Sequence, residues 1–293
     1  NGYKNVIRSC EKSLKRLKTD YIDIFQIHWP NSAYPLKQTI QALIHLYREG
    51  KIRNVGLSNF SIKEIKKAQK YLGDILISSI QMEYNLFERT IDRNGVSDYC
   101  TANDILLLAY SPLDQGQMSY ISPLKKNVLR KLAKKYDKSI PQIILNFIIS
   151  KPSNIAIMRT TSKNHLMENV KSMEFSLEKN DILKIEDTFP IKYVQIPIDK
   201  IVVSENGEWE HKVYKTLNEA IENKLGFTPS PINLAKSIKD NEYLKPVRVR
   251  QSLDGDSSEK YELVGGRIRY WAWRIAHKND CPDIPAYIRK KYN

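Results

Sequence analysis

The first 190 residues alternate short apolar runs with longer amphipathic stretches. The short runs are rich in Ile, Leu and Val and have the length of buried strands. They read YIDIFQIHW, NVGLSNF, LISSIQMEYN, ILLLAYSPL and NIAIMRT, and begin at residues 21, 54, 76, 105 and 154. A stretch with helical spacing follows each run. Buried strands that alternate with helices predict an α/β fold with a parallel sheet.

The amphipathic stretches begin and end at residues that cap helices. Ser61 precedes one of them and Glu64 follows three residues later, which predicts a capping box, and Gly73 predicts its end. Another stretch begins at residue 36 and ends at Gly50. Four of its side chains are predicted on one apolar face: Ile40, Leu43, Ile44 and Tyr47.

The pattern changes near residue 190. Residues 188–210 carry two prolines and two β-rich runs, which predict a linker into a second domain. Beyond it the sequence predicts a helix and a strand over 230–251, a strand, turn and helix over 257–279, and a closing strand from residue 284. We therefore expect two domains, residues 1–190 and 191–293.

The net charge of +14 raises the question of nucleic-acid binding. Residues 193–293 carry only +3, and the remaining +11 lies in the first two-thirds of the chain, mostly as lysines on the polar faces of helices. A solvated helix face explains this distribution. A nucleic-acid partner stays possible but is not favoured.

Other global features indicate a soluble, cytoplasmic protein. No apolar stretch approaches the roughly 18 to 20 residues of a membrane-spanning helix. Cys10, Cys100 and Cys281 are far apart and form no C-x-x-C pair, so neither a disulfide framework nor a cysteine metal site is indicated.

Hydrogen-bonding side chains lie at the end of every predicted strand of the first domain. A single histidine there is usually an ordinary polar residue, but polar side chains at all five strand ends together favour a functional site. In a parallel barrel, active sites assemble at this edge. The side chains are His28, Ser58, Asn59, Gln81, Tyr110, Ser111, Arg159 and Thr160.

Five segments of residues 1–188 resemble the aldo-keto reductases in order and spacing: SLKRLKTDYIDIFQIHWP, LYREGKIRNVGLSNFS, QMEYN, AYSPL and TTSKNHLMENV. The resemblance implies a (β/α)8 TIM barrel that binds NADP(H) and reduces aldehydes or ketones. It also implies a role for each matching residue. His28 would orient the substrate carbonyl, and the expected cofactor ligands are Ser58, Asn59 and Gln81 for the nicotinamide carboxamide, Tyr110 for its ring, Ser111 and Leu113 for the pyrophosphate, Arg159 and Thr160 for the 2′-phosphate, and Glu168 and Asn169 for the adenine.

The sequence departs from this family at two cofactor positions. His165 stands where many relatives have an arginine that stacks on adenine, which would relax selectivity for the 2′-phosphate. Asp114 follows AYSPL where a glycine is common, and its carboxylate would repel phosphate oxygens unless it points away.

The family's catalytic tyrosine, lysine and aspartate come from strands that precede the histidine, and no room for them exists before residue 23. The visible strands correspond to strands 4–8 of the barrel. We therefore expect this chain to be the C-terminal part of a longer protein, or to receive the other strands from a partner. We expect the chain alone to have little or no reductase activity.

Residues 193–293 resemble the small α+β ParB/sulfiredoxin fold through IPIDKI, LAKSIKDNEYLKPVRVR and YELVGGRIRYWAWRIA. The resemblance implies that ATP, ADP or CTP binds at the turn before the last helix. Glycines there let the backbone approach a phosphate, the helix offers free N–H groups, and arginines supply charge. The predicted ligands are Gly265, Gly266, Arg267 and Arg269.

Three functions remain open. The leading one is an NADP(H)-dependent reductase with an accessory nucleotide-binding domain. A second is a non-enzymatic, nucleotide-dependent regulator or DNA-associated protein on a degenerate barrel. The third is a small-molecule kinase, for which Glu205, Glu210 and His211 are candidate acid/base residues.

Overall fold

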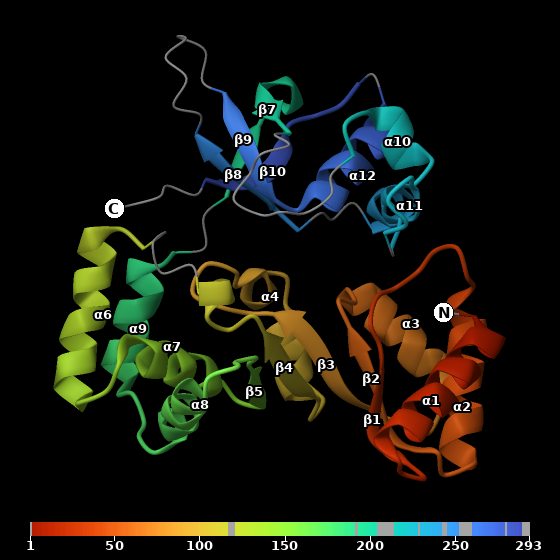
Figure 1. Cartoon of the computed structure of the whole chain (residues 1–293), viewed down its shortest axis with the longest axis horizontal. Coiled ribbons are helices and arrows are strands. Elements are labelled where there is room, and N and C mark those ends of the chain that lie inside the picture. Colours follow the sequence, from red (N-terminus) through yellow and green to blue (C-terminus); the bar gives the residue numbers. More distant parts are fainter. Residues whose placement is uncertain are drawn as a thin grey trace. The chain divides into compact units, whose positions relative to one another are not determined.

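The chain forms two compact units, shown in Figure 1. The computed structural model describes residues 2–116, 121–190, 193–203, 214–227, 229–241, 245–251, 260–278 and 280–288. Residues 1–30 and 34–191 make up the first unit, and residues 31–33 and 192–293 the second. None of the helices in these ranges is long and apolar enough to cross a membrane.

The first unit is built on a five-stranded parallel sheet whose order in space follows the order in the chain (Figure 1). All five strands predicted from the apolar runs are confirmed. They are β1 (Ile22–Ile27), β2 (Ile52–Ser58), β3 (Ile77–Glu83), β4 (Leu106–Tyr110) and β5 (Asn154–Ile157).

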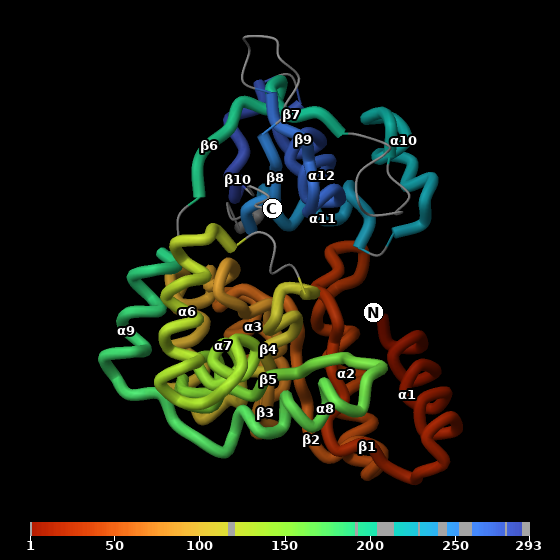
Figure 2. Tube along the Cα trace, turned by 60° about the vertical axis from the view of Figure 1, so that its left-hand side comes forward, coloured from red at the N-terminus to blue at the C-terminus, as the bar shows by residue number. Residues whose placement is uncertain are grey.

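Helices precede, connect and follow these strands, and the chain can be followed from one element to the next in Figure 2. They are α1 (Tyr3–Leu17), α2 (Leu36–Arg48), α3 (Ile62–Leu72), α4 (Thr90–Arg93), α5 (Val96–Ala102), α6 (Pro123–Tyr136), α7 (Ile140–Ile149), α8 (Lys163–Val170) and α9 (Lys179–Thr188). The capping box predicted for α3 is present: Ser61 Oγ accepts from the Glu64 amide, and the Glu64 carboxylate accepts from the Ser61 amide. Gly73 caps the other end with φ 64°.

The prediction for the apolar face of α2 is wrong at Tyr47. Ile40 and Leu43 are buried as expected, but the third large side chain against the core is Leu46, and Tyr47 is 40% exposed. On a helical projection Tyr47 lies between Ile40 and Leu43, so periodicity alone places it on the apolar face. Tyr47 belongs to the last turn of α2, however, and a phenol at the end of a helix can keep its hydroxyl in water.

The two faces of the sheet differ at β4 and β5. Leu107 and Ala109 of β4 are buried in the core under the helices. Leu106, Ile155 and Ile157 point to the opposite face and are 38%, 45% and 40% exposed. The alternation has the period of two expected of a strand with one covered face.

The described residues of the second unit form a mixed five-stranded sheet of order β6-β10-β8-β9-β7, which is accompanied by the helices α10, α11 and α12. Its elements are β6 (Val194–Ile196), β7 (Ile201–Val202), α10 (Leu217–Ile221), α11 (Pro231–Asn241), β8 (Val247–Gln251), β9 (Tyr261–Gly265), α12 (Arg267–His277) and β10 (Ile284–Ile288). The predicted helix–strand, strand–helix and closing-strand order is confirmed. Helix α12 buries Tyr270, Trp271 and Ala272 in a core separate from that of the first unit.

Candidate functional site

The register of the parallel sheet brings the predicted strand-end residues of the first unit to one edge. Ser58 is the Cα partner of Gln81, and Tyr110 is the partner of both Glu83 on β3 and Ile157 on β5. His28 directly follows Ile27, whose partner is Leu57. Polar residues from four neighbouring strands thus lie at the carboxyl edge, where ligands bind in such sheets.

Asn59 joins these strand ends through hydrogen bonds. Its Nδ2 donates to the His28 carbonyl oxygen (3.1 Å) and to Ser58 Oγ (2.9 Å). The Tyr110 hydroxyl donates to Asn59 Oδ1 (3.0 Å). The backbone N–H of Asn59 donates to the backbone carbonyl oxygen of Gln81 (3.0 Å). We call these five residues the strand-end network; they come from β1, β2, β3 and β4.

The backbone at two of these strand ends adopts a left-handed conformation. Asn59 has φ 63° and Ser111 has φ 51°. This conformation is tolerated by asparagine and disfavoured for serine, and such strain persists where the surrounding structure fixes it, often at functional sites. It turns the chain sharply at the ends of β2 and β4.

The network leaves Asn59 one unused hydrogen-bonding direction. An amide has two N–H donors and an oxygen with two lone pairs. Both donors are used by the bonds to His28 and Ser58, while among the described residues the oxygen accepts only from Tyr110. Asn59 can therefore accept one more hydrogen bond, as a ligand carboxamide NH2 would donate. Ser58, at 2% exposure, acts mainly as a support.

His28 lies at the exposed rim of the edge. Its imidazole lies beside the Trp29 ring, with ring centroids 6.1 Å apart and planes at 29°. Its carbonyl oxygen is held by Asn59, which fixes the backbone but leaves the imidazole accessible.

The predicted pyrophosphate residues lie next to Tyr110. Ser111 accepts through its carbonyl oxygen from Asn85 Nδ2 (3.2 Å) and from the Asp114 amide (2.9 Å). Leu113 packs against the core, and Asp114 is only 4% exposed. Asn85 is fully buried and positions the Ser111 turn; its place in QMEYN was the only signal for that role.

The predicted adenosine residues follow β5. Arg159 is exposed, and Thr160 Oγ1 accepts from the Ser162 amide (3.1 Å), just before α8 begins. On α8, His165 is exposed, Glu168 is half-buried and Asn169 is 7% exposed. No hydrogen bond within the described part of the chain joins this group to the strand-end network, so only the common sheet edge relates the two sets.

The predicted phosphate turn of the second unit joins β9 to α12. Gly266 has φ 84° and caps α12, and a side chain on Gly265 would press against Arg248 at 3.3 Å. Arg269 Nη1 donates to the carbonyl oxygens of Lys245 (2.9 Å) and Pro246 (2.7 Å). Arg269 therefore also joins the first turn of α12 to the segment before β8, a role that the sequence did not indicate.

Partial burial lowers the pKa of Arg267, opposed by the nearby Glu262 carboxylate. The candidate kinase residues Glu205, Glu210 and His211 lie outside the described residues. Within the described ranges no cluster of three or more His, Cys, Asp or Glu side chains is arranged to hold a metal ion.

The comparison with protein families agrees with the sheet and its polar edge. Residues 2–188 match the model of the Aldo/keto reductase family. The chain belongs to this family.

Curated relatives of the family are similar over the same region. The glyoxal reductase of Bacillus subtilis is 34% identical over 185 residues, which are 63% of this chain and 63% of the relative. A methylglyoxal reductase of Escherichia coli is 28% identical over 200 residues, 68% of this chain and 70% of the relative. The chain therefore spans less than two thirds of the first of these relatives.

Solved structures show the same fold. A thermostable aldo-keto reductase in complex with the inhibitor epalrestat has a TM-score of 0.61 and 34% identity, covering 64% of this chain and 67% of that one. An aldo-keto reductase from Klebsiella pneumoniae in complex with NADPH has a TM-score of 0.58 and 27% identity, covering 65% and 66%.

Proposed function

We propose that residues 2–188 bind NADP(H) at the carboxyl edge of the sheet and serve the reduction of small aldehydes or ketones. The observation that carries this proposal is the strand-end network, which holds groups from four strands in fixed positions around one unused amide lone pair. Because relatives reduce glyoxal and methylglyoxal, small dicarbonyls are the substrates to test first.

The residues at the edge fit the cofactor. Asn59 can accept from the carboxamide, the backbone of Gln81 is hydrogen-bonded to that of Asn59, and the half-buried Tyr110 ring can support the nicotinamide. Fixing the carboxamide plane decides which face of the ring meets the substrate. When bound, the reduced nicotinamide supplies a hydride. The exposed imidazole of His28 is free to donate a hydrogen bond to a carbonyl oxygen.

Arg159 is the residue proposed to select NADPH over NADH. A charged, forked donor binds a phosphate monoester well, and Arg159 is exposed beside the start of α8. Arg159→Ala is expected to raise the Kd for NADPH by about 10- to 100-fold, while the Kd for NADH changes less than about threefold. The change in NADPH fluorescence on titration measures the first Kd, and the change in NADH fluorescence measures the second.

Arg130→Ala is the matched control, because Arg130 is an exposed arginine on α6 outside the predicted site. It is expected to leave both affinities unchanged. If the parent chain and Arg159→Ala bind NADPH with equal affinity, Arg159 is not a ligand of the 2′-phosphate.

For the second unit we propose nucleotide binding at the Gly265–Gly266 turn. What favours it is a glycine at positive φ directly at the start of an eleven-residue helix, with the Arg269 guanidinium against that glycine. Free N–H groups at a helix start attract phosphate. The resemblance to ParB/sulfiredoxin domains supports ATP, ADP or CTP as the ligand.

Arg267→Gln tests this proposal better than Arg269→Ala. Removing Arg269 also removes hydrogen bonds to Lys245 and Pro246, so a loss of binding would have two explanations. Arg267→Gln is expected to weaken nucleotide binding by at least about tenfold without altering the circular dichroism spectrum. Calorimetry on the folded chain that detects no binding of ATP, ADP or CTP would overturn the proposal.

A further inference from the structure

A cavity of the first unit lies apart from the strand-end network. It has a volume of about 570 Å³ and opens between α5, the segment after α7 that leads into β5, and α9. That volume is within the range of sites for small organic ligands. None of its lining residues belongs to the strand ends described above.

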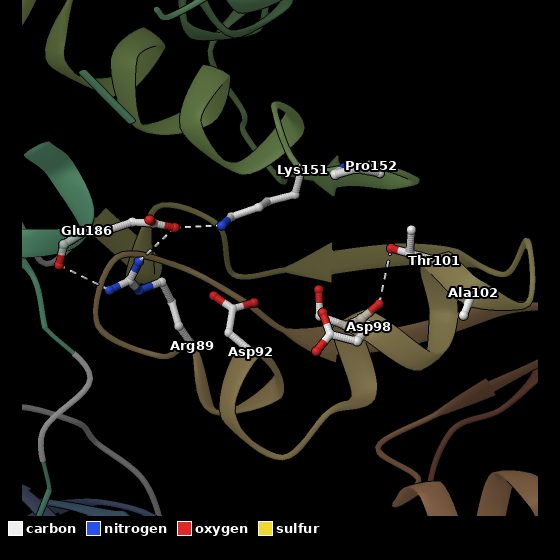
Figure 3. A pocket seen from close by; sticks show the side chains of 9 residues that line it. Arg89, Asp92, Asp98, Thr101, Ala102, Lys151, Pro152 and Glu186 are labelled. Atoms are coloured by element: carbon white, nitrogen blue, oxygen red, sulfur yellow. Dashed lines mark hydrogen bonds and ion pairs between the residues drawn. The ribbon is translucent and has the colours of Figure 1, made fainter. Parts of the chain in front are cut away.

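Two cations lie together in the lining of this cavity. Lys151 Nζ lies 2.5 Å from Glu186 Oε1, and Arg89 Nη1 lies 3.8 Å from the same oxygen. Figure 3 shows both cations reaching this one carboxylate. Two cations thus share the Glu186 carboxylate, and Asp92 also lies within the electrostatic range of both.

The position of Arg89 is fixed. It is 4% exposed, and its Nη2 donates to the carbonyl oxygens of Phe189 (2.5 Å) and Glu186 (3.4 Å). Its Nε has no hydrogen-bond partner among the described residues. A buried guanidinium held in this way provides a permanent positive potential at the wall of the cavity.

Two carboxylates lie further along the lining, as Figure 3 shows for Asp92 and Asp98. The Tyr84 hydroxyl donates to Asp92 Oδ2 (2.9 Å), and Oδ1 makes no hydrogen bond within the described part of the chain. Burial raises the pKa of Asp92, although the bond from Tyr84 and the charges of Lys151 and Arg89 oppose the rise. A half-buried carboxylate with one unused oxygen is favourably completed by a ligand cation.

We propose that this cavity binds a small zwitterion, with its ammonium group at Asp92 and Asp98 and its carboxylate at Lys151 and Arg89. A molecule with a single charge could pair with either the carboxylates or the cations of the cavity, but not with both. The ligand class is therefore that of amino acids and related amino carboxylates. This site does not depend on the reductase proposal, because the two share no residue.

The test compares 6-aminohexanoate with hexylamine and hexanoate, which each lack one of its charges. Calorimetric titration of the 293-residue chain is expected to show 6-aminohexanoate or its shorter homologue 4-aminobutyrate binding at least about tenfold more tightly than either single-charge compound. NADPH added beforehand is expected to leave this affinity unchanged.

Two conservative variants test which end of the cavity binds the ammonium group of the ligand and which binds its carboxylate. Asp92→Asn keeps an oxygen that can accept from Tyr84, and it is expected to weaken the zwitterion at least about tenfold and leave hexanoate binding unchanged. Lys151→Gln is expected to weaken the zwitterion similarly and leave hexylamine binding unchanged. Asp74→Asn, at an exposed carboxylate away from the cavity, is the control and is expected to have no effect.

Asp98→Asn adds a variant whose exposed position does not endanger folding. It is expected to weaken the zwitterion about threefold, as one of two carboxylates is removed. The proposal is overturned if neither zwitterion binds, if all three charge types bind equally, or if Asp92→Asn and Lys151→Gln leave zwitterion affinity unchanged on folded samples.

Discussion

Asn59→Leu is expected to abolish NADPH binding at concentrations that saturate the parent chain, and to destabilise the first unit by about 2 to 4 kcal/mol. The substitution removes the bonds to the His28 carbonyl oxygen and Ser58 Oγ and the acceptor for the Tyr110 hydroxyl. The Ser58 hydroxyl then stays buried with one partner fewer. Leucine is also strained at the φ of 63° that Asn59 adopts.

Asn59→Gly separates the two causes. Glycine tolerates a positive φ, so this variant removes the hydrogen bonds without the backbone strain. We expect it to recover part of the stability lost in Asn59→Leu but none of the NADPH affinity. NADPH fluorescence titration and urea unfolding measure the two effects, and an Asn59→Gly protein that binds NADPH normally would contradict the role of the amide.

Gly56→Val is expected to destabilise the first unit by about 3 kcal/mol or more, the largest effect on stability at a single glycine. A Cβ at this position would lie 2.6 Å from Ser79 Oγ and 2.7 Å from Gln26 Cγ. Gly56 is in β2 with β1 and β3 on either side, so the neighbouring side chains have little space into which they can move. Hydrogen exchange of the β1–β3 amides in increasing urea measures the loss.

A double variant tests the steric cause of this loss. Ser79→Ala removes one of the two clashing atoms, so Gly56→Ala combined with Ser79→Ala is expected to be less destabilised than the sum of the single changes. Gly50→Ala is the control, because a Cβ at Gly50 meets nothing within 4 Å and costs only the strain of φ 70°. A loss at Gly56 no greater than that at Gly50 would be inconsistent with a clash.

The strands of the first unit and several helices of both units could be predicted because they depend on local pattern. The five apolar runs became β1 to β5, and Ser61, Glu64 and Gly73 delimit α3 as their capping chemistry requires. The prediction for Tyr47 was wrong because helical periodicity places this residue on the apolar face but does not show where along the helix the core contact ends; Tyr47 lies in the last turn of α2.

The contacts within the site could be predicted only in part. The sequence indicated which residues gather at the carboxyl edge, because the ends of parallel strands share an edge. It did not indicate that Asn59 would connect four strands, since that depends on its left-handed backbone and on the register of β2 with β3.

The cavity beside α9 carried no signal in the sequence. Arg89 and Glu186 are 97 residues apart, and each is an ordinary charged residue in its own segment. Their meeting follows from the packing of α9, which is a consequence of tertiary structure. Arg269 is a similar case, because its carbonyl partners Lys245 and Pro246 precede it by more than twenty residues.

The central claim is that the carboxyl edge of β1–β5 is a platform for the nicotinamide. A crystal structure of this chain grown with saturating NADPH tests it most directly. We expect the carboxamide within hydrogen-bonding distance of Asn59 and Gln81, with the ring against Tyr110 and the imidazole of His28 beside it. NADPH bound elsewhere on the chain, or an ordered crystal with no NADPH at this edge, would contradict the account.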